Sequence, residues 1–279
     1  MLTDCHTHTE ASPDCDAPLS EMCRAAREKG IRCYAVTDHV ELCRWYPQAH
    51  YGAGAEDSGD GFDYAARFAR SMQQIQAEKA QQTDDFTLIS GVELGEPDAD
   101  PALAETIYQD ERLDFVLASL HELPGEKDFY FLDYTQDNAE QLLETYFAEL
   151  LHIARQGHFD VLAHLTYPLR FIAGRDNISV NMGKFRDCIA EIYRTLIARG
   201  KGIELNTAGY RRSYGKPSPE EELLRLYKDM GGKILTLGSD AHRPEDVGGA
   251  LEKGAALAKS CGFTEVCYFL RHAPHFVTL

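Results

Sequence analysis

Asp4-Cys5-His6-Thr7-His8 stands within the first ten residues, directly after the short apolar pair Met1-Leu2. In a β-strand, residues i and i+2 point to the same face. His6 and His8 can therefore direct two imidazoles at one point, which is what a chelated transition metal needs. Two histidines at this spacing are weak support by themselves. They gain weight if further His, Asp and Glu residues occupy the ends of later strands.

Strand-like and helix-like patterns alternate outward from this stretch along the whole chain. Short apolar runs typical of strands follow at 33–37, 86–92, 115–120, 160–163, 202–205, 234–238 and 266–270. Apolar residues at helical spacing, several ended by glycine, occupy 17–29, 64–82, 100–107, 138–156, 182–199, 219–230 and 249–261.

This β-then-α order with short connections predicts a parallel sheet, and at 279 residues a closed α/β barrel. The chain contains no recognisable linker, so we expect a single domain over residues 1–279. The alternative is an open doubly wound sheet. That fold would gather its ligands at one crevice and not from nearly every strand.

Polar residues that can bind a ligand stand at the ends of these strands. They are His6, His8, His39, Glu93, His121, His164, Asn206, Asp240 and His242. The C-terminal ends of the strands of a β/α barrel converge on one face, where active sites lie. Isolated core or surface histidines would not recur at the same position of successive units. The remaining histidines do not share this pattern, and we expect them to be ordinary core or surface residues. They are His50, His152, His158, His272 and His275.

Imidazoles mixed with carboxylates suit zinc, manganese or iron, whereas calcium and magnesium prefer sites made of oxygen atoms. The candidate ligands are too many for one tetrahedral ion. They would fit two or three metals close together, bridged by a carboxylate. Such clusters hold a hydroxide at neutral pH and clamp the oxygens of a phosphate during in-line displacement.

Composition limits the partners. Lys and Arg number 28 and Asp and Glu 45, so the net charge is −17, which makes a poor general binder of nucleic acid or anionic membrane. No apolar stretch approaches the roughly 20 residues that span a bilayer, and no basic, apolar leader follows Met1. The eight cysteines are scattered without a CxxC pair, so we expect reduced thiols in a cytoplasmic protein.

Seven segments, taken in order, resemble the polymerase and histidinol phosphatase (PHP) superfamily, and within it the histidinol-phosphatases of the PHP type. They are Asp4-Cys-His-Thr-His8, Thr37-Asp-His39, Gly91-Val-Glu-Leu-Gly95, Ser119-Leu-His121, Ala163-His164, Glu204-Leu-Asn-Thr-Ala-Gly209 and Gly238-Ser-Asp-Ala-His242. The resemblance covers nearly the whole chain. It implies a distorted (β/α)7 barrel with a metal site at the C-terminal ends of the strands, and it leaves the strand at 266–270 outside the barrel.

The resemblance also implies a set of ligands for three metals. One metal would be held by His6, His8, Glu93 and Asp240, a second would share Glu93 and add His121 and His164, and a third would take Asp14, His39 and His242. Family members carry His or Asp at the place of Asp14, and Asp16 competes for this role. Catalysis would depend on Glu93, Asp240 and His242, with a metal-bridging hydroxide attacking in line and no covalent phosphoenzyme.

The activity implied by the resemblance is hydrolysis of L-histidinol phosphate in histidine biosynthesis. A phosphate favours a guanidinium, and Arg170 and Arg211 stand where these phosphatases carry basic residues. The ammonium and imidazole of this substrate would suit acidic and aromatic groups. The candidates are Glu41 and Trp45 in a long loop over 40–61, Glu122 and Tyr210.

Two other functions stay open at this point. A relative of these enzymes could hydrolyse nucleotide phosphates or cyclic phosphodiesters, because loops that vary within the family set the substrate. A metal-stabilised module without catalytic activity, attached to a polymerase, is the third possibility.

Overall fold

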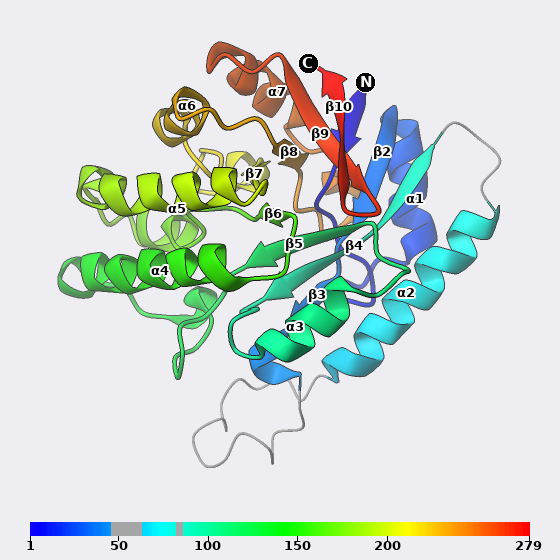
Figure 1. Cartoon of the computed structure of the whole chain (residues 1–279), viewed down its shortest axis with the longest axis horizontal. Coiled ribbons are helices and arrows are strands. Elements are labelled where there is room, and N and C mark those ends of the chain that lie inside the picture. The colour runs from blue at the N-terminus through cyan, green and yellow to red at the C-terminus, as the bar shows by residue number, and fades with distance from the viewer. Residues whose placement is uncertain (46–62, 82–85) are drawn as a thin grey trace.

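A parallel β-sheet curls into a barrel in the computed structural model, which describes residues 1–45, 63–81 and 86–279 (Figure 1). Its strands follow one another in space in the order of the chain. They are β1 (Leu2–Asp4), β2 (Ile31–Val36), β4 (Thr87–Gly95), β5 (Phe115–Ser119), β6 (Val161–Leu162), β7 (Gly202–Asn206) and β8 (Leu235–Gly238). The predicted distorted (β/α)7 barrel is confirmed.

The barrel closes through the residues that follow β1. The backbone N–H of Cys5 donates to Leu237 O at 2.8 Å, and that of Asp240 donates to His6 O at 2.8 Å. The N–H of His8 then donates to Ala241 O at 2.9 Å. Residues 5–8 therefore extend β1 alongside the end of β8. The two histidines of the first motif lie at the seam of the barrel.

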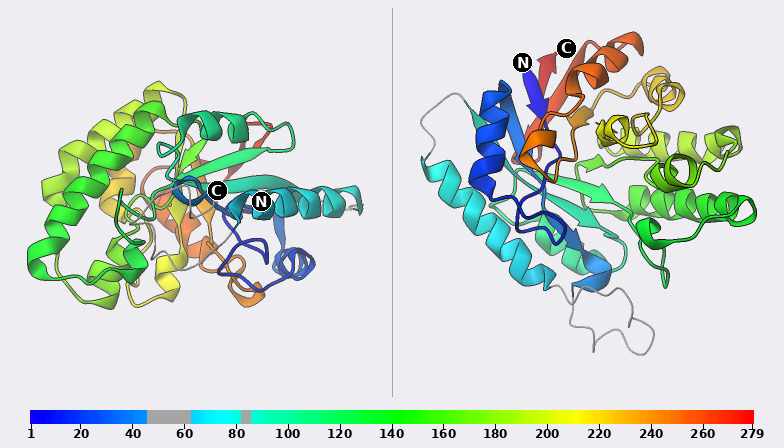
Figure 2. Two further views of the ribbon diagram at one scale, coloured as in Figure 1. Left: turned by 90° about the horizontal axis from the view of Figure 1, so that it is seen from below. Right: turned by 180° about the vertical axis from the view of Figure 1, so that it is seen from behind.

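Helices cover the outside of the barrel (Figures 1 and 2). Six of them connect successive parallel strands, and α7 follows β8. They are α1 (Leu19–Glu28), α2 (Tyr64–Gln81), α3 (Pro101–Tyr108), α4 (Gln136–Gln156), α5 (Arg186–Ala198), α6 (Glu221–Asp229) and α7 (Leu251–Ser260). Helix α4 shows why they pack there, because Leu143, Phe147 and Leu150 are buried on one of its faces. The N-terminus of α3 follows the expected pattern, since Asp100 accepts a hydrogen bond from Leu103 N.

Short helical turns follow several strands. They are η1 (Leu42–Arg44), η3 (Phe129–Phe131), the π-helical turn η4 (Arg170–Arg175), η5 (Met182–Phe185), η6 (Ala208–Arg211) and η7 (Pro244–Asp246). The helix predicted at 182–199 is divided into η5 and α5. The other predicted helices begin and end within two residues of the observed bounds.

The region after β2 differs from the prediction. A further strand, β3 (His39–Glu41), pairs with β4 in the register that β2 has already set: Val36 pairs with Ser90 and His39 with Glu93. Strand β4 therefore continues beyond Glu93, which had been expected to follow its end. Of the long loop predicted over 40–61, residues 46–61 lie outside the described residues.

A C-terminal hairpin covers the N-terminal end of the barrel. It consists of β9 (Glu265–Leu270) and β10 (Ala273–Thr278), which form a separate antiparallel sheet. Cys267 and Phe269 join the apolar cluster inside the barrel, and the ring of Phe269 stacks on Phe115 with centroids 5.1 Å apart. β9 thus lies outside the barrel sheet, as expected, whereas β10 was not predicted.

Within the described ranges, no helix combines the length and the apolar character that crossing a membrane requires. All eight cysteines are free thiols.

Candidate metal centre

The carboxylate of Glu93, on β4, lies at the centre of a group of histidines. Its Oε1 atom lies 2.8 Å from His164 Nε2 and 3.1 Å from His121 Nε2. Its Oε2 atom lies 3.0 Å from His6 Nε2, 3.1 Å from His39 Nδ1 and 3.5 Å from His8 Nε2. Residues from the ends of four strands thus surround one buried carboxylate.

Four groups of side chains in this cluster have donor atoms within 4.8 Å of one another. They are His6, His8 and Glu93; Glu93, His121 and His164; His8, His39 and His242; and His39, Glu41 and His121. Two of these groups belong to the first and second ligand sets that the sequence predicts, and the third contains His39 and His242 of the third set.

Two further acids complete the predicted sets. Asp14 Oδ2 lies 3.0 Å from His242 Nε2 and 3.6 Å from His39 Nε2. Asp14 and its competitor Asp16 are both exposed, so the contacts with His242 and His39 are what favours Asp14. Asp240 Oδ1 lies 3.6 Å from His8 Nε2. The structure thus brings all nine predicted metal ligands to one place, while their role as ligands stays a prediction.

Asp240 uses its two oxygens differently. While Oδ1 faces the imidazoles, Oδ2 lies 2.8 Å from Arg170 Nη2 and accepts a hydrogen bond from Asn206 Nδ2 at 3.3 Å. Asn206 Oδ1 in turn accepts from Arg170 Nη2 at 2.8 Å. Arg170 and Asn206 therefore fix the orientation of the Asp240 carboxylate.

Glu204, in the middle of β7, forms hydrogen bonds with two of these histidines. The Nδ1 atom of His6 lies 2.8 Å from Glu204 Oε1, and the backbone N–H of His164 donates to Oε2 at 2.9 Å. A carboxylate behind a histidine fixes its tautomer and ring orientation, so that Nε2 of His6 points toward Glu93. Glu204 is not among the residues predicted for the site, although an acid inside an apolar strand is a sequence signal of such a role.

Asp38 supports the other side of the cluster. It accepts hydrogen bonds from Thr9 N at 2.7 Å, from Ser12 Oγ at 2.9 Å and from Ser71 Oγ at 2.6 Å. Ser12 Oγ lies 3.2 Å from His8 Nδ1. Ser12 thereby links the buried Asp38 carboxylate to the His8 ring.

Glu93 is ionised despite its burial. Burial opposes the charge, but the imidazoles of His6, His39 and His121 together outweigh it and hold the pKa of Glu93 well below its usual range. Burial likewise opposes ionisation of Asp240, and Arg170 reverses the effect, so the pKa of Asp240 is also well below normal.

Burial lowers the pKa of His8 well below its ordinary value, and the neighbouring His242 and His39 add to the effect. Burial also lowers the pKa of His164. Both imidazoles are therefore neutral, which is the form that binds metal ions.

This donor set fits a transition-metal centre. Neutral imidazole nitrogens and ionised carboxylates are the ligands that zinc, manganese and iron accept. In addition, the buried Nδ1 atom of His39 lies 3.1 Å from Glu93 Oε2 and 3.4 Å from Glu41 Oε1, but neither contact has the alignment of a hydrogen bond. A buried nitrogen that lacks a well-aligned partner is costly unless something else binds it.

Three of the residues predicted to contact substrate lie beside the cluster. Arg170 is buried against Asp240. Glu41 Oε1 lies 3.1 Å from His121 Nδ1. Glu122 accepts a hydrogen bond from the thiol of Cys43 at 2.8 Å and contacts Arg44.

The other three predicted contacts make their observed interactions elsewhere. The Trp45 ring lies near Phe68 of α2, with centroids 6.3 Å apart. Lys253 Nζ of α7 lies 3.8 Å above the ring of Tyr210. Arg211 donates hydrogen bonds to backbone carbonyls of the segment after β8. The structure thus does not bring these three side chains together with the cluster.

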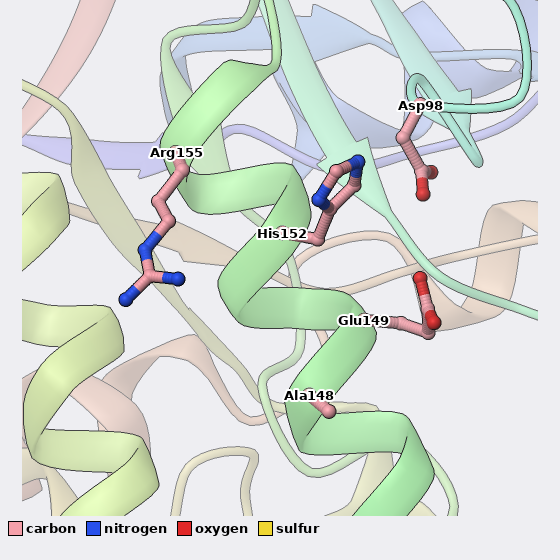
Figure 3. A pocket seen from close by; sticks show the side chains of 5 residues that line it. All are labelled: Asp98, Ala148, Glu149, His152 and Arg155. Carbon is pink, nitrogen blue, oxygen red and sulfur yellow. The ribbon is translucent and has the colours of Figure 1, made fainter.

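The described histidines that had not been expected in the site lie apart from it. His152 lines a surface hollow on α4 together with Asp98, Glu149 and Arg155 (Figure 3). The Nδ1 atom of His272 lies 2.8 Å from Asp160, and His275 stacks on Tyr268. His50 lies outside the described residues.

The fold and the cluster define a β/α-barrel protein with a centre rich in histidine and carboxylate, the kind of centre that binds metals. Residues 4–208 match the PHP domain family, and the chain belongs to this family.

Several relatives have similar sequences and lengths. The chain is 26% identical to a probable histidinol-phosphatase of Thermotoga maritima, with 94% of this chain and 93% of that protein covered. It is 25% identical to the histidinol-phosphatase of Lactococcus lactis, with 95% and 93% covered.

The fold is also similar to solved structures. The L. lactis histidinol phosphate phosphatase, crystallised with zinc, L-histidinol and phosphate, matches with a TM-score of 0.75 at 24% identity over 98% of both chains. A putative histidinol phosphatase from Listeria monocytogenes matches with a TM-score of 0.73 at 18% identity, over 90% of this chain and 99% of that one.

Proposed function

We propose that this protein is a metal-dependent phosphomonoesterase that hydrolyses L-histidinol phosphate to L-histidinol and phosphate, a step of histidine biosynthesis. The observation that carries the chemistry is the buried Glu93 carboxylate with imidazoles of five histidines within 3.5 Å. The choice of substrate is supported by relatives named histidinol-phosphatase over nearly their whole length.

We propose that the cluster holds two or three divalent ions of zinc, manganese or iron. The first would bind His6, His8, Glu93 and Asp240; the second Glu93, His121 and His164; the third Asp14, His39 and His242. When bound, such ions supply Lewis acidity toward a phosphate and a nucleophilic hydroxide at neutral pH.

Residues of the chain would hold the ligands of this centre in position and balance the charge of the metal ions. Glu93 would bridge two metals, because its two oxygens face different imidazoles. Arg170 keeps Asp240 in place and has an Nε atom that is buried without a hydrogen-bond partner in the described part of the chain. That N–H is suited to donate to a phosphate oxygen.

Glu41 and Glu122 are the proposed partners of the positively charged end of the substrate. They belong to a group of acids beside His121, together with Glu96, whose pKa is raised well above normal by burial and by the charges of Glu41 and Glu122. A substrate ammonium would relieve this repulsion. Trp45 and Tyr210 remain proposed contacts that would need to turn toward the substrate.

We also propose that residues 1–279 act as one domain, because Cys5, directly after β1, and the C-terminal hairpin pack into the same barrel interior. The eight free thiols suit a reducing compartment such as the cytoplasm.

The test is phosphate release after reconstitution with zinc or manganese, comparing L-histidinol phosphate with nucleotide phosphates, cyclic phosphodiesters and sugar phosphates. We expect kcat/KM for L-histidinol phosphate to be higher by a factor on the order of 100 or more. Preference for a nucleotide or a cyclic diester would identify a different PHP phosphoesterase. Stoichiometric metal binding without hydrolysis of any ester would instead indicate a non-catalytic module.

A further inference from the structure

Asp240 adopts an unusual backbone conformation directly after β8. Its φ angle is +53°, in the left-handed region that residues other than glycine rarely enter. Aspartate tolerates this region better than most residues, but the surroundings must hold it there. The backbone at this point decides where the Asp240 carboxylate points.

The preceding residue, Ser239, is held by side chains on both sides. Its N–H donates to Asp4 Oδ1 at 2.8 Å and its Oγ–H to Asp4 Oδ2 at 2.6 Å. Its carbonyl oxygen accepts from Arg211 Nη2 at 2.7 Å. Two side chains from distant parts of the sequence therefore satisfy all three polar groups of Ser239.

Each of these two side chains also holds the segment that follows. Asp4 Oδ2 accepts from Gly248 N at 2.9 Å. Arg211 donates from Nη1 to Gly249 O at 3.1 Å, and its Nε lies 3.2 Å from Asp246 Oδ1. A Cβ atom at Gly249 would lie 2.6 Å from Arg211 Nη1, so glycine is what allows this approach.

We propose that Asp4 and Arg211 are positioning residues that clamp Ser239 and so keep the Asp240 carboxylate between His8 and Arg170. This inference rests on the proposed role of Asp240 as a metal ligand. It assigns Arg211 a role other than contact with phosphate, because all three of its guanidinium nitrogens already have partners within the protein. Asp4 ends β1, two residues before His6, so the clamp also joins the two strands that close the barrel.

The test compares Arg211→Met and Asp4→Asn with the unmodified protein. The matched control is Arg212→Met, which removes a neighbouring arginine that is exposed. Five quantities are measured: zinc affinity, kcat and KM for p-nitrophenyl phosphate, the inhibition constant of inorganic phosphate, and thermal stability.

We expect both clamp variants to lose roughly 10- to 100-fold in zinc affinity and in kcat, as is typical when the support of a metal ligand is removed. KM and the inhibition constant of phosphate should stay within about two-fold, because no contact with phosphate is removed. Arg212→Met should change none of these quantities.

Two results would overturn the proposal. Unchanged zinc affinity in both clamp variants would show that Asp240 does not depend on them. A rise in KM and in the phosphate inhibition constant, with zinc retained, would place Arg211 in the phosphate site. If Arg211→Met does not fold, Arg211→Lys decides, because one ammonium keeps the charge but cannot reach both carbonyls.

The readouts separate this proposal from the proposed function. Zinc affinity and p-nitrophenyl phosphate do not involve histidinol. If the clamp variants bind zinc more weakly but the unmodified protein does not hydrolyse L-histidinol phosphate, the clamp is supported and the proposed substrate is wrong.

Discussion

Glu93 is the residue that contacts most of the histidines in the site. A buried carboxylate normally resists ionisation, and here surrounding imidazoles reverse that tendency. In the proposed function, the same imidazoles would become metal ligands once they lose their protons. The charge of Glu93 would then be balanced by metal ions in place of the protonated imidazoles.

Replacing Glu93 by Gln should lower kcat for a phosphomonoester by a factor on the order of 100 or more, because an amide cannot bridge two cations. The fold should survive, since Gln has nearly the same volume. The measurement is steady-state kinetics together with metal content and circular dichroism. Glu111→Gln, at an exposed position, is the control. A near-normal rate in Glu93→Gln would refute the assignment of the site.

The C-terminal hairpin is an element whose turn is under strain. Arg271 and His272 form its two-residue turn with φ angles of +48° and +60°. This geometry favours Asn and Gly. Backbone N–H groups of both residues donate to Asp114, and the ring of His272 contacts Asp160, so the barrel holds the turn in place.

Arg271→Gly should therefore stabilise the protein. A non-glycine residue in the left-handed region destabilises the folded protein by about 1–2 kcal/mol, and glycine removes this cost. Glycine also raises the conformational entropy of the unfolded chain, which offsets about 0.5–1 kcal/mol of the gain. A net gain of about 0.5–1 kcal/mol should appear in urea denaturation. Arg271→Val, whose branched side chain disfavours positive φ, should destabilise the protein instead. Equal stability of the two variants would contradict this account of the turn.

At the scale of the whole molecule, the barrel brings together acids and histidines whose charges depend on one another. Burial opposes protonation of His6, His39 and His121, yet the adjacent carboxylates raise the pKa of all three well above its ordinary value. Stability from these protonated imidazoles is present below their unfolded pKa. It is lost as pH rises through their folded pKa.

Removing the metals with a chelator should therefore make stability depend on pH. The melting temperature of the chelated protein should fall as pH rises above about 6.5, the ordinary pKa of histidine. The metal-loaded protein should be more stable across this range and should not show the same fall, because metal binding requires the neutral imidazole and strengthens with pH. Calorimetry at several pH values with and without zinc measures both curves. Parallel curves would argue against metal binding at these histidines.

Much of the architecture could be predicted from the sequence because its signals are local. Alternating strand-like and helix-like patterns, with glycine after several helices, indicated the barrel and most helix bounds. The recurrence of His, Glu and Asp at strand ends indicated the cluster, because parallel strands in a barrel carry such residues to one face. His39 and Glu93, far apart in the chain, indeed pair across β3 and β4.

The sequence by itself determined the alternation of elements, the face of the barrel that carries the site and the residues that gather there. Only the tertiary structure decided how those residues are held: Glu204 behind His6, Asp38 behind Ser12, and Arg211 on Ser239 and not free in the site. The physical reason is that periodicity reports on burial within one element. A hydrogen bond between side chains about 200 positions apart, such as His6 with Glu204, leaves no periodic trace and exists only once the barrel has closed.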